Sequence, residues 1–325
     1  MMDASSDDGA QQLTSLQKSN PDYRVRTPRP HEYLDVLSLL FDRFPQASRE
    51  SLYRWVRNAY QQRPDIFKGL IMMGRHGRVH AATWAYRLPG SQLMLWRTNY
   101  SQSLEVSVRR YFLGEVNRYL AASDAAIAWM SIKPEDEKTR QDLEWLAFEK
   151  VTDLATMVSP LRRVEEVGLP CGVSLQAFDH QLHRDRLINV VNSAREGSLD
   201  CPVMDKLRDA KDVVEGHLYR DGCNSSDWCL VQQDGEDVGC LLLSHHADQP
   251  QAELVYFALL PQVRGHGMGR ELIRFVQFKA KSKGADYLSL TCDIDNHPAW
   301  KTYCQTGFVE VDRWEFHAKG LRETS

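Results

Sequence analysis

A glycine-rich segment in the C-terminal half has the residue types and spacing of an anion-binding turn. Residues 252–260 have the apolar and β-branched composition of a strand, and apolar residues from Leu272 to Ala280 recur at helical spacing. Between them, residues 261–270 read Pro-Gln-Val-Arg-Gly-His-Gly-Met-Gly-Arg. Such a turn points several backbone N–H groups at one spot, where the helix dipole adds positive potential. Glycines let a phosphate approach the backbone closely, so the segment predicts an anion site.

The glycine spacing distinguishes this segment from two other phosphate-binding loops. A Walker A loop ends in Gly-Lys-Ser/Thr, whereas Gly269 is followed by Arg270. A dinucleotide-binding loop reads Gly-x-Gly-x-x-Gly, whereas the glycines here stand at 265, 267 and 269. The pattern Arg264-x-x-Gly267-x-Gly269 instead resembles the pyrophosphate loop of the GNAT acyltransferase superfamily, which binds acetyl-CoA.

A second motif carries the same resemblance. Residues 287–293 read as a strand, and the segment from Asn296 to Phe308 then has the form Asn-x-x-Ala-x-x-x-Tyr-x-x-x-Gly-Phe. This form is similar to the closing motif of the GNAT superfamily. Because both motifs occur in the expected order, the resemblance is strong over about residues 170–320. It implies an α/β (α+β) fold with a mixed, twisted sheet flanked by helices.

The resemblance also implies how acetyl-CoA would be held. The backbone N–H groups of the loop would bind its pyrophosphate, and the end of the preceding strand would pair with its pantetheine arm. The backbone N–H of Leu259 would also polarise the thioester carbonyl. The residues assigned to cofactor binding are Leu259, Leu260, Val263, Arg264, Gly265, His266, Gly267, Met268, Gly269, Arg270, Asn296 and Tyr303.

Three side chains are candidates for further polar roles. Tyr303 matches the family's tyrosine that protonates the leaving CoA sulfur, although a tyrosine on an amphipathic helix also suits a core. Asn296 matches the family's pantetheine-contacting asparagine and would also serve as the N-cap of the helix entered through Pro298. Glu253 resembles the glutamate that takes a proton from the substrate amine in histone-type members; the alternative is a solvated residue at a strand start.

Composition limits the other classes of function. The chain of 325 residues has 42% hydrophobic and 26% charged residues, which is ordinary for a soluble protein of two domains. No apolar run approaches the ~20 residues that span a bilayer, and the N-terminus lacks a secretory signal. We therefore expect a cytoplasmic location without membrane contact. No dense basic patch is present, so a nucleic acid partner is not expected.

Cysteines and charges are distributed unevenly. All seven cysteines lie between Cys171 and Cys304, and none forms a Cys-x-x-Cys pair. Neither a disulfide framework nor a zinc site is therefore expected, and no other metal site is assigned. From residue 161 onward the chain carries 19 Lys and Arg against 25 Asp and Glu. This negative balance favours a cationic acceptor such as an amine.

The two halves of the chain repeat one order of expected elements. A strand, two helices, a hairpin, a strand, a helix, a strand, a helix and a final strand follow one another in each half. We predict two tandem GNAT-like domains, at residues 21–160 and 161–325, after a disordered tail at residues 1–20. Within them we expect a single strand at residues 92–100, a single helix at residues 204–218 and an N-cap at Ser48.

The first copy lacks the residues that acyl transfer would use. Residues 101–105 read Ser-Gln-Ser-Leu-Glu, with no glycine and with an acid where pyrophosphate would lie. Its closing helix carries Trp145 and Leu146 instead of the Asn and Tyr positions of the second copy. We therefore expect a degenerate N-terminal copy that does not bind CoA.

The sequence favours an acetyl-CoA-dependent N-acyltransferase that moves an acetyl group to an amine-bearing acceptor by direct sequential transfer. Two alternatives stand beside it. A catalytically silent sensor or scaffold would bind acyl-CoA but release no thiol with any amine. A transferase that uses charged tRNA is disfavoured by the acidic second half and the intact loop.

Overall fold

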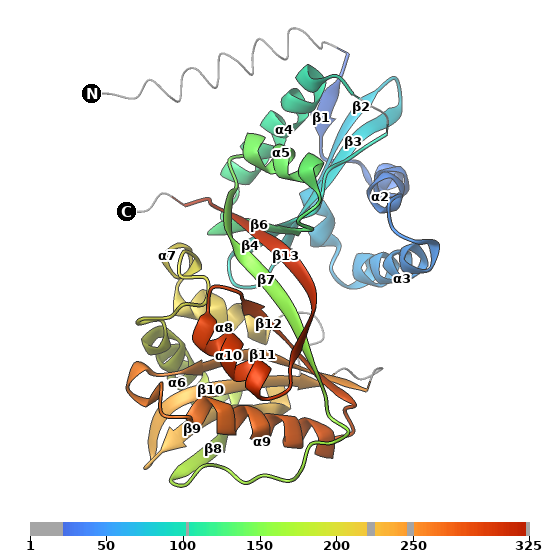
Figure 1. The fold of residues 1–325 in the computed structure, drawn as a ribbon. Helices are drawn as coiled ribbons and strands as arrows, with labels where there is room; N and C mark the ends of the chain where they lie inside the picture. Colours follow the sequence, from blue (N-terminus) through green and yellow to red (C-terminus); the bar gives the residue numbers. More distant parts are fainter. Residues whose placement is uncertain (1–21, 102–103, 220–224, 246–249, 323–325) are drawn as a thin grey trace, which may run out of the picture. The chain divides into compact units, whose positions relative to one another are not determined.

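The chain forms two compact units (Figure 1). The computed structural model describes residues 22–101, 104–219, 225–245 and 250–322, and the expected tail at residues 1–20 lies outside these ranges. Unit 1 comprises residues 1–88, 92–150 and 317–325, and unit 2 comprises residues 89–91 and 151–316.

This division differs from the expected join between residues 160 and 161. Strand β7 (Glu149–Pro160) pairs antiparallel with β12 (Tyr287–Asp293) from Leu154 to Pro160, so most of β7 belongs to unit 2. Conversely, Lys319 near the end of the chain donates to Asn117 Oδ1 at 2.6 Å and to the carbonyl of Leu146 at 2.9 Å, both in unit 1. Most of β7 therefore lies in unit 2 and the end of the chain lies in unit 1, although the order of the sequence would place each with the other unit.

Unit 1 is built on a sheet in the order β1-β2-β3-β4-β6, followed by the end of β13. The pair β4–β6 is parallel, while β1–β2, β2–β3 and β3–β4 are antiparallel. Its elements are β1 (Arg24–Arg26), α2 (Tyr33–Phe41), α3 (Gln46–Gln62), β2 (Leu70–Arg75), β3 (Arg78–Leu88), β4 (Gln92–Leu95), β5 (Asn99–Tyr100), α4 (Val106–Ala121), β6 (Ile127–Ile132) and α5 (Glu137–Trp145).

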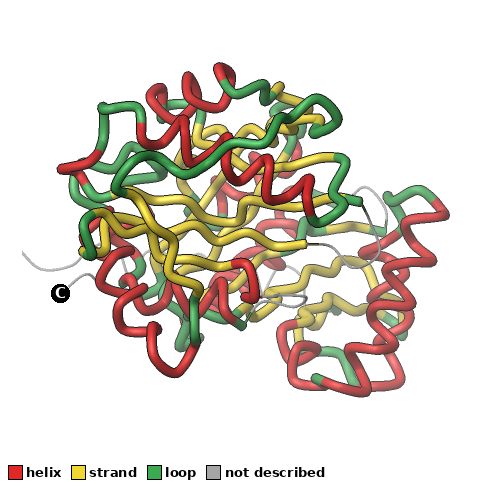
Figure 2. Tube along the Cα trace, turned by 90° about the horizontal axis from the view of Figure 1, so that it is seen from below, coloured by secondary structure: helices red, strands yellow, loops and turns green. Residues whose placement is uncertain are grey.

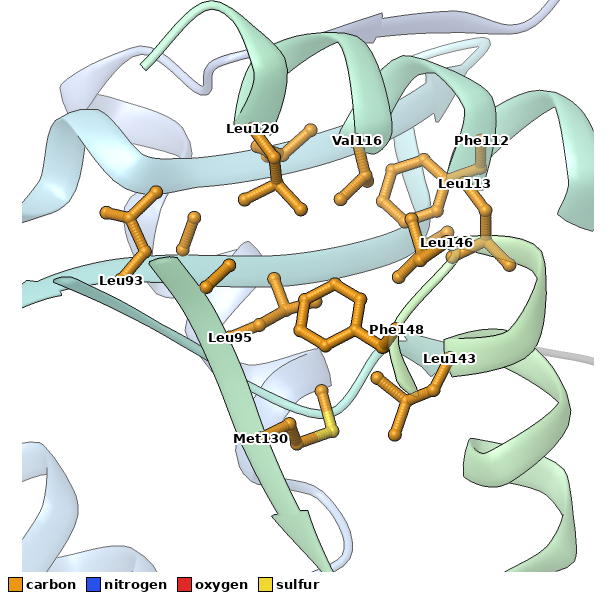
Figure 3. Packing of buried hydrophobic residues seen from close by; sticks show 14 of the residues in the cluster. Leu93, Leu95, Phe112, Leu113, Val116, Leu120, Met130, Leu143, Leu146 and Phe148 are labelled. Carbon is orange, nitrogen blue, oxygen red and sulfur yellow. The ribbon is translucent and has the colours of Figure 1, made fainter. Parts of the chain in front are cut away.

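One core of unit 1 lies under helices α4 and α5. Figure 3 shows Phe112, Leu113, Val116 and Leu120 of α4 pointing toward the strands, at the spacing of one helical face. Each is at most 1% exposed. Full burial of such side chains contributes about 1.5–3 kcal/mol each. They pack with Leu93, Leu95, Met130, Leu143, Leu146 and Phe148.

Two expectations for unit 1 are wrong in detail. Residues 92–100 form two strands because the segment contains a bulge: Trp96 N–H donates to the carbonyl of Trp84, yet Asn99 pairs with Ala82. From Trp96 to Asn99 the chain advances by three residues, whereas the opposite strand β3 advances by only two, from Trp84 to Ala82. Ser48 does not cap α3, which begins at Gln46, directly after Pro45.

Unit 2 contains a sheet in the order β13-β7-β12-β11-β10-β9-β8. Helices flank the strands, as the tube view shows (Figure 2). No helix among the described residues has the length and apolar character needed to cross a membrane. The elements are β8 (Val173–Ala177), α6 (His180–Ala194), α7 (Met204–Leu207), α8 (Ala210–Leu218), β9 (Trp228–Gln233), β10 (Glu236–His245), β11 (Gln251–Leu259), α9 (Met268–Ser282), β12, α10 (His297–Gln305) and β13 (Val309–Gly320).

Helices cover the sheet of unit 2 through two separate cores. Leu272, Ile273 and Val276 of α9 pack with β12 and α10, whereas Leu187 and Val191 of α6 pack with α8. The single helix expected at residues 204–218 is instead two, α7 and α8. The reason is local: Asp209 is extended and its side chain caps α8 by accepting the Asp212 N–H at 2.7 Å.

The last helix of each unit begins and ends in the same way. Asp136 caps α5 by accepting the Thr139 N–H, and Asn296 caps α10 by accepting the Ala299 N–H. Eleven positions after each cap the backbone turns left-handed, at Ala147 (φ 57°) and Gly307 (φ 88°). The next residue, Phe148 or Phe308, donates its N–H to the carbonyl of Leu143 or Tyr303. Leu143 therefore corresponds to Tyr303.

The left-handed turns at Ala147 and Gly307 predict opposite changes in stability when alanine is exchanged for glycine and glycine for alanine. An alanine in the left-handed region is strained by about 1 kcal/mol, whereas glycine is not. Ala147→Gly is expected to raise the free energy of unfolding by up to ~1 kcal/mol, and Gly307→Ala to lower it by about 1 kcal/mol or more. Differential scanning calorimetry of the full chain checks both, and a lower unfolding temperature for Ala147→Gly would contradict the shared turn geometry.

Candidate active site

Strands β11 and β12 separate after a short parallel pairing. Their register runs only from Gln251 with Tyr287 to Glu253 with Ser289. On its other edge β11 stays paired with β10 as far as Leu259, but the register shifts by one residue, so that Val255 has no partner. A bulge of this kind bends its strand. Beyond Glu253 the edge of β11 that faces β12 therefore lacks a neighbouring strand.

A cavity of about 570 Å³ occupies this opening in unit 2. Its walls are residues 254–259 of β11, residues 290–292 of β12, the segment 197–201 after α6, the glycine loop and the first turns of α10. The cavity therefore combines an open strand edge, which offers backbone donors and acceptors, with the start of a helix.

The glycine loop adopts the conformation that its sequence predicts. Gly265 and Gly267 have φ of 81° and 89°, and Gly267 is the N-cap of α9. A Cβ at either position would meet open space, so glycine is needed for backbone conformation and not for packing. The first N–H groups of α9 have no partner within the helix. Gly265, Gly267, Gly269 and Arg270 line the cavity, whereas Val263, His266 and Met268 do not.

Arg264 holds the loop in place through three backbone carbonyls. Its Nε donates to Leu259 O at 2.8 Å, Nη1 donates to Glu196 O at 2.9 Å, and Nη2 donates to Ala194 O. Burial lowers the pKa of this guanidinium, which nevertheless keeps its charge at neutral pH. Arg264 thus ties the loop to the end of β11 and to the last turn of α6, where a cation also suits the helix dipole.

Tyr303 projects from α10 into the cavity. The residue is 8% exposed, and its ring lies 5.7 Å from that of Phe308. Within the described residues its hydroxyl has no hydrogen-bond partner. Burial raises its pKa above the usual value, and the Cys292 and Asp200 side chains raise it further. The hydroxyl therefore stays protonated at neutral pH and can act as a donor.

The other predicted residues divide into two groups. Leu259 and Asn296 line the cavity, and the Asn296 side chain oxygen also accepts the Ala299 N–H at 3.3 Å, as the N-cap alternative expects. Leu260 and Glu253 do not line it. Glu253 is half-buried at the last position where β11 is paired on both sides, opposite Ser244 and Ser289.

The structure adds carboxylates that the sequence did not indicate. Asp200 and Asp205 line the cavity, and Asp293 lies buried behind them. They come from the segment after α6, from α7 and from the end of β12. No spacing rule connects these positions, so only the folded chain brings them together.

Side chains of α4, α5 and β5 contact one another in unit 1. Arg109 of α4 donates to Asp142 of α5 at 2.5 Å, and Tyr100 of β5 donates to the same carboxylate at 3.0 Å. The Arg109 guanidinium also lies over the rings of Tyr100 and Trp145, 5.2 and 5.1 Å from their centroids. Unit 1 thus has an ion pair between its helices α4 and α5, and Leu143 stands at the position that corresponds to Tyr303.

Comparison with known proteins places the resemblance on unit 2. The family model for the Acetyltransferase (GNAT) family matches residues 193–308, which include most of the cavity wall, the loop and α10. Mycothiol acetyltransferase of Actinosynnema mirum is 26% identical over 178 residues, 52% of this chain and 55% of that protein. The uncharacterized N-acetyltransferase YycN of Bacillus subtilis is 34% identical over 87 residues, 26% of this chain and 56% of that protein. The chain thus spans about half the length of these curated relatives.

A solved structure extends the likeness in fold to both units. The GCN5-related N-acetyltransferase from Sphaerobacter thermophilus superposes with a TM-score of 0.61 at 16% identity, over 93% of this chain and 96% of that one. The mixed, twisted sheet with flanking helices is therefore a GNAT-like fold, as the motifs predicted.

The position of Arg264 generates a stability prediction. Arg264→Lys keeps the charge but cannot reach three carbonyls, so about 1.5–3 kcal/mol of unfolding free energy should be lost. Calorimetric unfolding of the full chain measures this loss. Arg270→Lys, an exposed change in the same loop, is the matched control and should leave the midpoint unchanged. Equal midpoints for both variants would contradict the bracing role.

Proposed function

We propose that the protein is an acetyl-CoA-dependent N-acyltransferase that transfers the acetyl group directly to an amine. The observation that carries this proposal is one cavity that joins the glycine loop, the open edge of β11 and the Tyr303 hydroxyl. The GNAT family match over the same residues supports it. The names of both relatives, a mycothiol acetyltransferase and an N-acetyltransferase, describe acetyl transfer by those proteins.

The donor would be bound mainly by the backbone. Its pyrophosphate suits the unpaired N–H groups at the start of α9, because the helix dipole and the glycines both favour an anion there. The amides of its pantetheine arm suit the backbone groups of β11 that lack a neighbouring strand. The Leu259 N–H lies at the end of this edge, where it would polarise the thioester carbonyl. Asn296 and Arg270 line the same cavity and complete the proposed contacts.

Tyr303 would act on the leaving sulfur. A thiolate that departs into a buried cavity needs a hydrogen-bond donor, and the raised pKa of Tyr303 keeps its hydroxyl protonated. Transfer is direct in this proposal, so the amine attacks the bound thioester without a covalent enzyme intermediate.

Unit 1 would support the fold without doing chemistry. Its ion pair between Arg109 and Asp142 commits the side chains that face the equivalent opening, and Leu143 lacks a hydroxyl. We therefore propose one donor site per chain, in unit 2, and a degenerate first copy.

This proposal predicts the binding stoichiometry. Calorimetric titration of the full chain should give one acetyl-CoA per chain, and a stoichiometry of two would contradict the single site. Gly267→Asp should weaken binding at least about tenfold, because its charge would face the pyrophosphate. Gly235→Asp is the matched control: its φ of 88° and open surroundings resemble those of Gly267, but it lies in the β9–β10 hairpin. Its affinity should be unchanged.

A second prediction concerns turnover. Tyr303→Phe keeps the ring packing against Phe308 and removes only the donor. The rate of thiol release with an accepted amine should fall by about 100-fold, whereas acetyl-CoA affinity should change less than about twofold. A rate within about twofold of the unaltered protein would contradict the general-acid role. Binding of acetyl-CoA without thiol release to any amine would support the sensor alternative instead.

A further inference from the structure

Three carboxylates gather beside the cavity, and two of them already have partners. Asp293 Oδ1 accepts hydrogen bonds from Thr152 Oγ1 at 2.6 Å and from the Asp295 N–H at 2.9 Å. Its Oδ2 accepts the Cys201 N–H at 2.9 Å. The Asp205 carboxylate forms an ion pair with Arg195 Nε at 3.0 Å. Both groups are therefore committed to holding the segment between α6 and α7.

Asp200 is the third carboxylate and has no cationic partner within the described residues. It lines the cavity and is exposed to it. The surrounding protein and the charges of Asp293 and Asp205 together raise the pKa of Asp200 to about 6, while a backbone hydrogen bond from Asp293 partly offsets them. Binding of a cation or a proton would therefore stabilise a carboxylate in these surroundings.

A second, independent group faces the same cavity. Tyr303 is more than nine-tenths buried, and its hydroxyl lacks a partner in the described part of the chain. The charge of Asp200 is one of the causes that raise the pKa of Tyr303, so the two side chains are within electrostatic range. The cavity thus holds a proton donor and a proton acceptor together, and acyl transfer from a thioester to an ammonium needs both.

We infer that Asp200 is the general base that takes a proton from the ammonium of the acceptor. This inference rests on the proposed function. The neutral nitrogen then forms a bond to the acetyl carbon, and the C–S bond breaks with its electron pair on sulfur. Tyr303 gives its proton to that sulfur and recovers one through solvent from the nitrogen. Asp200 releases its proton to solvent, so the products are an amide, a thiol and one proton.

The positions of the two carboxylates favour Asp200 over Glu253 as the general base. Glu253 sits where β11 is still paired on both sides and does not line the cavity, whereas Asp200 does. The raised pKa of Asp200 also brings its carboxylate nearer to the working pH of a general base. The Asp200 segment also lies beside the open part of β11, where the thioester would be. Other titratable or charged groups around Asp200 are Arg195, Cys201, Asp205, Tyr256, Cys292, Asp293 and Tyr303.

Two acceptors that differ in basicity test the inference. n-Butylamine is almost fully protonated at neutral pH, whereas hydroxylamine is mostly neutral there and needs no base before attack. In the full chain, Asp200→Asn should lower kcat/KM for n-butylamine about 100-fold and change that for hydroxylamine less than about threefold. Acetyl-CoA affinity, measured by calorimetry, should stay within about twofold. Asp185→Asn removes a charge from the exposed face of α6 and serves as the matched control, with unchanged rates.

The pH profile provides a further readout. The basic form of Asp200 is present above its pKa of about 6, so the rate with n-butylamine in the unaltered protein should rise through that pH and then level off. In Asp200→Asn the rate should instead keep rising toward the pKa of the amine, because only the neutral amine reacts.

Each outcome decides between distinct conclusions. Equal losses with both acceptors, or a selective loss in Glu253→Gln instead of Asp200→Asn, would overturn the role of Asp200 and leave the proposed function standing. Absence of thiol release from the unaltered protein with both acceptors and with a panel of other amines would overturn the proposed function and this inference with it.

Discussion

The bulge at Val255 is the constraint on which the site depends. It ends the pairing of β11 with β12 after three residue pairs while β11 remains attached to β10. Backbone groups that a continuous sheet would satisfy internally are thereby left without a neighbouring strand, and the space between the strands becomes the cavity. The glycine loop and Tyr303 line one cavity because this opening lies between them.

Residues that act through local backbone geometry could be predicted from the sequence. The glycine loop, the Asn296 cap and the helix that carries Tyr303 each follow from neighbours within a few positions. Asp200 could not be predicted, because its surroundings come from α7 and β12, far away in the chain. The place of β7 in the sheet of unit 2 could not be predicted either, because the pairing of β7 with β12 is non-local. The break at residues 92–100 required knowledge of the register against β3.

The two units share a framework but differ in the side chains that lie on it. The parallel strands β4 and β6 of unit 1 and β11 and β12 of unit 2 each stay paired over only three residue pairs. A bulge follows in β11 and in the segment between β4 and β5. In unit 1, Arg109 of α4 pairs with the carboxylate of Asp142 and stacks on two aromatic rings. Leu143 stands there at the position that corresponds to Tyr303 of unit 2.

The three carbonyls held by Arg264 restrict how this site can change during evolution. One guanidinium joins the glycine loop to residues 194 and 196, which lead directly into the cavity wall that carries Asp200. An insertion or deletion between residues 194 and 196 would shift these carbonyls and leave the half-buried Arg264 guanidinium with fewer acceptors, a costly state. Side-chain replacement at constant length would keep these contacts, whereas a change in length between residues 194 and 196 would need a compensating change at position 264.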